Sequence, residues 1–274
     1  MRALDGTSGR SFRAGHYMQL FVQKTGPPVE YARWSPQYER IRAEFGFRWE
    51  EERRAAARLR ELLPAEARAR PLERVGKRLR GRTAVVVGLA PGAGAPPLWQ
   101  LDGVEEPPAL LAADGAAERC LSAGLVPDVL VTDLDGPVAS EVTANARGAL
   151  AVVHAHGDNL PALDRWVPEF RGELAGSWAG PPEEALIDVG GFTDGDRAAY
   201  LAEHLGSRRI LLWGFDLDRP DPELAKDVER KRAKLRWAES LLTELARASS
   251  TPVAWWGRDG AIRPLPHRTG PATQ

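Results

Sequence analysis

The chain has 274 residues, 43% of them apolar, and its 37 Lys and Arg residues nearly balance its 38 Asp and Glu residues. This composition is typical of a globular protein, and it argues against a nucleic-acid footprint or a membrane-surface patch as the basis of function. The single cysteine, Cys120, excludes an internal disulfide. Residues 1–13 lack a signal-peptide core and no run approaches the roughly 20 apolar residues of a membrane span, so we expect a cytoplasmic protein with no nucleic-acid or membrane partner.

The first part of the chain divides by composition into two segments. Residues 1–28 are polar and aperiodic, and we expect a loosely ordered extension with at most one short strand at 17–22. Residues 29–80 carry apolar side chains at helical spacing, which Pro64 and Pro71 interrupt. We therefore predict a helical N-terminal subdomain over residues 29–80.

From residue 81 the pattern changes to short apolar runs that alternate with helical segments. The runs cover residues 84–87, 109–113, 129–131, 149–153, 185–187, 210–213 and 252–256. Each has the length of a strand buried on both faces, which is typical of parallel sheets. The longest helix is expected at 223–248 and a flexible tail at 261–274. We therefore predict an α/β catalytic domain over 81–260, with a mostly parallel, Rossmann-like, three-layer sheet.

Acidic residues follow most of the predicted strands. They are Asp114, Asp133, Asp135, Asp158, Asp194, Asp196, Asp216 and Asp218. The carboxyl ends of parallel strands meet at one edge of the sheet, where open α/β sheets bind ligands. Because like charges this close together destabilise a fold, we expect a hard cation to relieve them. Mg²⁺ prefers oxygen ligands and substrate phosphates, so this edge predicts a site for a metal–nucleotide complex.

Some of these side chains also fit structural roles. Asp114 fits a cap for the helix that begins at Gly115, and Thr193 with Asp196 fits an acidic variant of a capping box. For any single Asp the structural and the functional interpretations stay open.

Two pairs of polar residues occupy positions i and i+2. Asp133 and Asp135 point the same way if the segment is extended, and their crowding favours a functional role. His154 and His156 share this spacing. One Cys and no third His nearby argue against zinc, which leaves a structural or substrate-contacting role.

A glycine-rich loop at residues 88–94 follows the first predicted strand. Its amides would suit phosphate oxygens, and a plain tight turn is the alternative. The Gly-Lys-Ser/Thr ending of a Walker A loop is absent. We predict phosphate-binding roles for Gly88, Gly92 and Gly115.

Several segments together point to a known family. They are residues 34–41, 45–47, 113–116, 127–136, 154–159, 190–198 and 234–239, and they include Thr132-Asp133-Leu134-Asp135-Gly136. They resemble the archaeal 6-hydroxymethyl-7,8-dihydropterin diphosphokinases over about residues 34–245. A more distant similarity is to the thiamine diphosphokinase catalytic domain. Both families transfer diphosphate from ATP to an alcohol and release AMP.

The resemblance implies a reaction and a set of catalytic residues. Asp133, Asp135 and Asp158 would hold Mg²⁺ on the ATP phosphates. The pterin hydroxymethyl oxygen would attack the β-phosphorus in line, and AMP would leave. ATP and a reduced pterin are therefore the expected partners; the sequence leaves the oligomeric state open, a homo-oligomer included.

Substrate contacts are expected from Asp114, His156, Asn159, Phe192, Asp194, Asp196 and Arg197. The pterin presents two adjacent N–H donors, which suit the side-chain oxygens of Asp194, Asp196 and Asn159. Phe192 fits either stacking on the ring or core packing. His156 would assist deprotonation of the hydroxymethyl group, and Arg197 would contact phosphate or pair with a neighbouring Asp.

Two other functions fit the same pattern. One is a diphosphokinase that acts on thiamine. The other is a non-catalytic nucleotide- or sugar-binding module with the same sheet. The intact pair Asp133 and Asp135, together with Asp158, favours an enzyme over a binding module.

Overall fold

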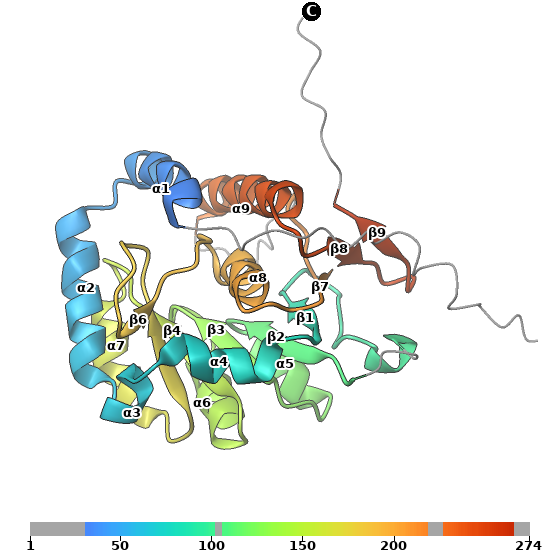
Figure 1. Ribbon diagram of the computed structural model, residues 1–274, viewed down its shortest axis with the longest axis horizontal. Helices are drawn as coiled ribbons and strands as arrows, with labels where there is room; N and C mark the ends of the chain where they lie inside the picture. The colour runs from blue at the N-terminus through green and yellow to red at the C-terminus, as the bar shows by residue number, and fades with distance from the viewer. Residues whose placement is uncertain (1–30, 102–105, 219–226, 266–274) are drawn as a thin grey trace, which may run out of the picture.

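Alternating burial places successive side chains of each strand in two different cores. The computed structural model describes residues 31–101, 106–218 and 227–265. Its sheet runs in the order β6-β5-β4-β3-β2-β1-β7-β8-β9 (Figure 1). The strands are β1 Thr83–Val87, β2 Ala109–Ala113, β3 Val129–Thr132, β4 Leu150–His154, β5 Leu174–Ser177, β6 Leu186–Ile187, β7 Arg209–Trp213, β8 Val253–Trp256 and β9 Ile262–Pro264. Every neighbouring pair from β6 to β8 is parallel, and β9 is antiparallel to β8.

Helices cover both faces of the sheet and complete three layers. They are α1 Tyr31–Phe45, α2 Trp49–Leu62, α3 Ala65–Arg68, α4 Pro71–Leu79, α5 Ala116–Ser122, α6 Val138–Ala146, α7 Leu160–Trp166, α8 Asp194–His204 and α9 Val228–Ala248, with 3₁₀ turns at Leu98–Leu101 and Val167–Glu169. Buried residues of α1, α4, α8 and α9 share one core, and those of α2, α3, α5, α6 and α7 share the other. The predicted mostly parallel α/β sheet is thus confirmed, because strands covered on both faces must be apolar throughout.

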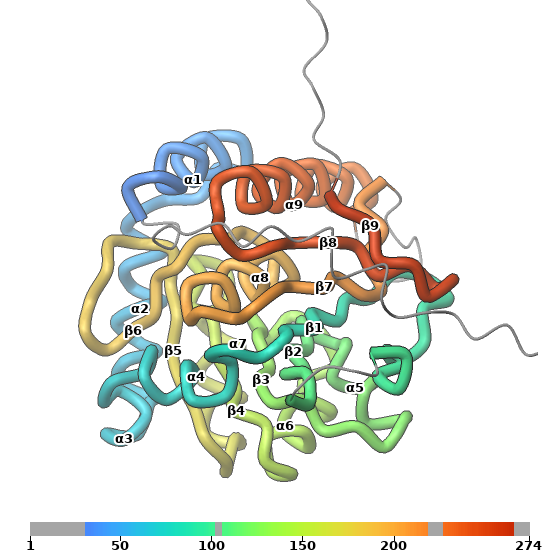
Figure 2. Tube along the Cα trace, turned by 45° about the vertical axis from the view of Figure 1, so that its right-hand side comes forward, coloured from blue at the N-terminus to red at the C-terminus, as the bar shows by residue number. Residues whose placement is uncertain are grey.

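The N-terminal helices do not lie together on one side of the sheet. α1 packs beside α9 (Figures 1 and 2), where Trp237 Nε1 donates to Glu44 Oε2 at 2.8 Å. α2 and α3 contribute to the opposite core. The division of the chain into subdomains therefore stays a prediction. Among the described helices, none is both long enough and apolar enough to cross a bilayer.

Two strands were not predicted. β5 reads Leu-Ala-Gly-Ser, which has too few large apolar side chains to stand out, and β9 is short and mostly exposed. β9 begins inside the segment 261–274 that we expected to be a tail, and α9 begins at Val228. The predicted extension over 1–28, its strand at 17–22 and the remainder of the tail from residue 266 lie outside the described residues.

The close packing of β5 generates a first prediction. A Cβ built on Gly176 would lie 2.5 Å from Leu186 Cδ2 and 2.7 Å from Leu63 Cδ1. Gly176→Ala should therefore lower the free energy of unfolding by about 1–3 kcal/mol, as overpacking does. In the control Gly94→Ala the new Cβ meets nothing within 4 Å. Urea denaturation checks this, and equal midpoints for the two variants would contradict it.

Candidate functional site

The loops after β2 and β3 pack directly against each other at the carboxyl edge of the sheet. Asp114 and Leu134 both adopt left-handed backbone conformations, with φ of 48° and 68°. Asp114 N donates to Val131 O at 2.8 Å. Gly136 can have no side chain, since a Cβ there would lie 2.3 Å from Asp114 Oδ1. Left-handed backbone conformations are unfavourable for non-glycine residues and are common at functional sites, so this edge is the candidate functional site.

Four carboxylates meet here, and we call them the acidic cluster: Asp114, Asp133, Asp135 and Asp194. Burial raises the pKa of Asp133 to about 7, and the charges of Asp135 and Asp114 add to the rise. Burial also raises the pKa of Asp194 well above its usual range, followed by the charges of Asp133 and Asp114. The four groups therefore repel one another when ionised.

The chemistry of the acidic cluster suits a hard divalent cation. All of its donors are carboxylate oxygens, and a bound cation would relieve the repulsion that raises their pKa values. Among the described residues, no group of three or more His, Cys, Asp or Glu side chains stands in metal-binding geometry. The third predicted ligand, Asp158, pairs instead with His156.

A charged network occupies the loop after β4. His156 Nε2 lies 2.8 Å from Asp158 Oδ1, and His156 Nδ1 lies 2.8 Å from Oε1 of Glu52, a buried residue of α2. Burial alone would lower the pKa of His156, but its hydrogen bonds to Asp158 and Glu52 outweigh burial and raise the pKa to about 9. The same hydrogen bond lowers the pKa of Asp158 to about 2. The raised pKa favours the charged imidazole at neutral pH, and both of its nitrogens are engaged. Its role in deprotonating the hydroxymethyl group stays a prediction.

Asn159 ties this loop to the neighbouring one. Its Nδ2 donates to Asp133 O at 2.8 Å and to His154 O at 2.7 Å, while its Oδ1 accepts from His156 N at 3.0 Å. The amide thus holds the loop after β4 against the loop after β3. His154 is buried with Nδ1 3.0 Å from Ser177 Oγ, and burial lowers its pKa well below the usual range.

The start of α8 confirms the capping-box interpretation. Asp196 Oδ1 accepts from the backbone N–H of Thr193 at 2.6 Å and of Phe192 at 3.1 Å, and Asp196 has no exposed surface. Arg197 Nη2 donates to Phe192 O at 2.9 Å. Asp194, at the first position of the helix, is half-buried and faces the other three carboxylates of the acidic cluster.

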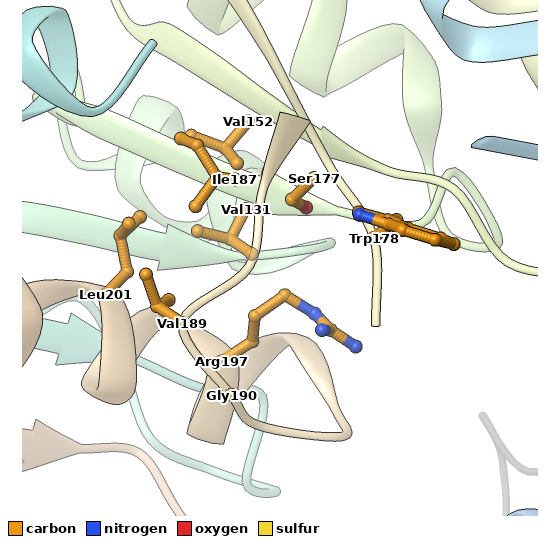
Figure 3. A pocket seen from close by; sticks show the side chains of 9 residues that line it. All are labelled: Val131, Val152, Ser177, Trp178, Ile187, Val189, Gly190, Arg197 and Leu201. Atoms are coloured by element: carbon orange, nitrogen blue, oxygen red, sulfur yellow. The ribbon is translucent and has the colours of Figure 1, made fainter. Parts of the chain in front are cut away.

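A small pocket lies where β3 to β6 end beside α8. It is lined by Val131, Val152, Ser177, Trp178, Ile187, Val189, Gly190, Arg197 and Leu201. Aliphatic side chains gather on one side, with the indole of Trp178 and the guanidinium of Arg197 on the other (Figure 3). Trp178 Nε1 and Arg197 Nε are both buried and have no hydrogen-bond partner in the described part of the chain. Two donors at an apolar slot suit a flat ligand with acceptor atoms on its edge.

Aromatic and cationic side chains also lie near the acidic cluster. The ring centres of Phe192 and Phe45 lie 5.2 Å apart, and Lys234 Nζ lies 6.0 Å from the ring centre of Phe192. The core-packing interpretation of Phe192 therefore applies in this structure. Burial raises the pKa of Asp114, and the charge of Lys231 opposes that rise. The charge of Lys234 likewise opposes the rise in the pKa of Asp133. α9 thus places positive charge beside the acidic cluster.

Two of the three predicted phosphate-binding glycines, Gly88 and Gly115, have packing roles in the structure. Gly88 N donates to Trp213 O at 2.9 Å and Gly88 O accepts from Arg119, so its backbone is occupied. Gly115 closely approaches Pro137. Gly92 has a φ of 67° and lies in an exposed turn. Their contact with phosphate stays a prediction.

Sequence reasoning missed two buried acids, Glu52 and Glu141. Both lie on the apolar face of a helix: Glu52 shares its face with Ala55, Ala56 and Leu59 of α2. A carboxylate at an apolar position of a helix is the signal that could have found them, because such a group needs a polar partner. Asp216 and Asp218 form a separate turn after β7, where Asp218 N donates to Asp216 Oδ1 at 3.2 Å.

Repulsion in the acidic cluster predicts a pH-dependent stability. The folded state raises the pKa of Asp133, so binding of its proton stabilises the folded state. This contribution to the free energy of unfolding is fully present below pH about 4 and is lost as the pH rises through about 7. Without metal at pH 8, Asp133→Asn should raise the melting temperature by about 2–4 °C per kcal/mol of relieved repulsion, and at pH 4 it should change nothing. Differential scanning fluorimetry in EDTA measures this.

The same experiment is repeated with MgCl₂ in place of EDTA. MgCl₂ should raise the melting temperature of the natural protein and of the control Asp218→Asn, and it should leave Asp133→Asn unchanged. A loss of stability in Asp133→Asn that is equal at both pH values would contradict the repulsion.

Comparison with known proteins identifies a family. The family model described as 6-hydroxymethylpterin diphosphokinase MptE-like matches residues 59–221. A 6-hydroxymethyl-7,8-dihydropterin pyrophosphokinase of Methanothermobacter thermautotrophicus is 37% identical over 238 residues, which cover 83% of this chain and 100% of the relative. Relatives of the same name from Pyrococcus furiosus and Methanocaldococcus jannaschii are 38% and 30% identical, covering 78% and 79% of this chain and 93% and 96% of the relatives. The chain therefore belongs to the MptE-like family of 6-hydroxymethylpterin diphosphokinases.

Proposed function

We propose that this protein transfers diphosphate from ATP to the hydroxymethyl group of 6-hydroxymethyl-7,8-dihydropterin and releases AMP. The observation that carries the proposal is the acidic cluster at the carboxyl edge of the sheet, between the lysines of α9 and the pocket beside Trp178. The names of the three relatives support the same reaction. The bond from the pterin hydroxymethyl oxygen to the β-phosphorus forms as the bond from the β-phosphorus to the α,β-bridging oxygen breaks. AMP leaves with the bridging oxygen, and the hydroxyl proton is released to solvent.

Phosphoryl transfer depends mainly on positioning and on positive charge. Asp133 and Asp135 would hold Mg²⁺, since they flank one turn and Asp135 is exposed to an arriving nucleotide. When bound, the cation supplies charge that stabilises the phosphoryl oxygens. Lys231 and Lys234 of α9 would attract the triphosphate to the same place, which a purely acidic edge would repel.

The pocket in Figure 3, with an open volume of about 10 Å³, would have to widen to take the pterin ring. Its aliphatic wall suits a flat ring, and its two unpartnered donors suit the carbonyl oxygen and adjacent ring nitrogen on one edge of a pterin.

The reaction is tested by incubating the protein with ATP, MgCl₂ and the reduced pterin, and by measuring AMP and the pterin diphosphate. AMP should form only with the pterin, and Asp133→Ala should reduce its rate by about 100-fold or more, as loss of a metal ligand does. Thiamine serves as the comparison acceptor. AMP with thiamine but not with the pterin would refute the proposed substrate, and AMP with neither would refute the activity.

The ring pocket is tested by Trp178→Phe, which keeps the aromatic body and removes the N–H donor. The KM for the pterin should rise about three- to tenfold, the worth of one hydrogen bond, while the KM for ATP stays within about twofold. Trp99→Phe is the matched control, because Trp99 is 72% exposed. An unchanged KM for the pterin in Trp178→Phe would place the ring elsewhere.

A further inference from the structure

A buried acid lies behind the acidic cluster, on the side away from the proposed substrates. Glu141 belongs to α6 and has no exposed surface. The helix face that carries it also carries the buried Val138, Ala144 and Asn145. A carboxyl group in such surroundings is costly unless its oxygens find hydrogen-bond partners.

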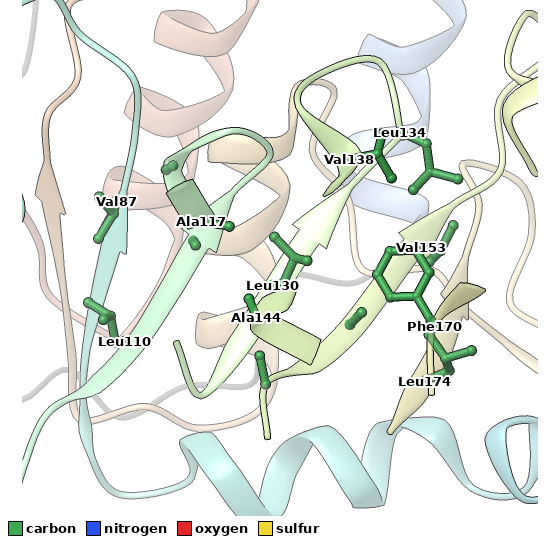
Figure 4. Close-up of a cluster of buried hydrophobic side chains, with 14 of the residues drawn as sticks. Val87, Leu110, Ala117, Leu130, Leu134, Val138, Ala144, Val153, Phe170 and Leu174 are labelled. Atoms are coloured by element: carbon green, nitrogen blue, oxygen red, sulfur yellow. The ribbon is translucent and has the colours of Figure 1, made fainter. Parts of the chain in front are cut away.

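One oxygen of Glu141 holds the turn that carries the proposed metal ligands. Thr132 Oγ1 donates to Glu141 Oε2 at 2.8 Å, and the same hydroxyl accepts from Leu134 N at 2.9 Å. Leu134 has the left-handed φ of 68° and a buried side chain, which lies beside Val138 in Figure 4. The strained residue at the centre of the turn is thus fixed through both its backbone and its side chain. Of its neighbours, Asp133 is half-buried and Asp135 is exposed.

The other oxygen of Glu141 meets the neighbouring loop. The carboxyl groups of Glu141 and Asp114 lie within hydrogen-bond reach of each other. Glu141 Oε1 and Asp114 Oδ1 are both buried, and neither has another partner among the described residues. Two carboxyl groups can share such a bond only when one of them carries a proton. Burial, followed by the hydrogen bond to Asp114, raises the pKa of Glu141 to about 9, and burial raises the pKa of Asp114 as well.

We infer that Glu141 is a positioning residue, a buried acid that accepts from Thr132 and lies against Asp114, and that it so holds the loops after β2 and β3 in register. The effect on activity rests on the proposed function, because the loops it holds carry the proposed magnesium ligands. The hydrogen bonds themselves do not depend on which reaction the protein catalyses. The inference therefore has one structural and one kinetic consequence.

Two substitutions at this position test whether the turn needs the hydrogen bonds of this side chain. Glu141→Gln keeps an acceptor for Thr132 and a donor for Asp114, and it should keep kcat within about threefold. Glu141→Leu has a similar size but no polar atoms, and it should reduce kcat by about 100-fold through misplacement of the turn, with a smaller change in the KM for ATP. Glu118→Leu, an exposed acid on α5, is the control and should match the natural protein.

Hydrogen exchange provides a readout that needs no substrate. The Leu134 amide, and the peptide around residues 129–137, should exchange slowly in the natural protein and in Glu141→Gln, and quickly in Glu141→Leu. Thr132→Val removes only the hydroxyl and should also speed exchange. It replaces Glu141→Leu in this experiment if circular dichroism shows that Glu141→Leu does not fold.

The outcomes are separable. If Glu141→Gln is as impaired as Glu141→Leu, hydrogen bonding by this side chain does not position the turn and the inference is wrong. It is also overturned if exchange at Leu134 stays slow in Glu141→Leu or, where that variant does not fold, in Thr132→Val. If the natural protein releases no AMP, the proposed function fails, while the exchange rates still decide whether Glu141 positions the turn.

Discussion

Repulsion between carboxylates at the carboxyl edge of the sheet is the constraint on which the rest of the site depends. Burial and mutual charge raise the pKa values of Asp133 and Asp194, so the folded chain stores unfavourable electrostatic energy at this edge. Two left-handed non-glycine residues, Asp114 and Leu134, add backbone strain in the same loops. Native proteins are stable by only about 5–15 kcal/mol, so such a site requires a rigid support. The parallel strands, packed on both faces, provide it.

Hydrogen bonds between loops convert that support into a defined arrangement of side chains. Asn159 joins the loop after β4 to the backbone of Asp133, and Glu141 with Thr132 joins α6 to the turn after β3. The Asn159 link runs between segments that leave the adjacent parallel strands β3 and β4. A network of this kind limits how far the acidic groups can move apart, and a bound cation with its nucleotide is then the remaining way to lower their repulsion.

Elements far apart in sequence complete the site. α2 supplies Glu52, which holds His156 in its charged form, and α9 supplies Lys231 and Lys234 beside the acidic cluster. Phe45, at the end of α1, packs against Phe192 at the start of α8. The N-terminal helices therefore contribute directly to the functional edge. This explains why a family resemblance extends beyond the strands and their loops to residues near both ends of the described chain.

The sequence alone determined the sheet and its functional edge, because both follow from local patterns. Strands buried on both faces must be apolar throughout, and their parallel pairing sends the following Asp residues to one edge. The capping box of Thr193 and Asp196 is equally local. Tertiary structure alone decided which oxygens face a ligand and which are consumed by the protein. Asp158 is paired with His156, and Glu141 is brought from a helix face to Asp114, because such partners are set by distance in space rather than by spacing along the chain.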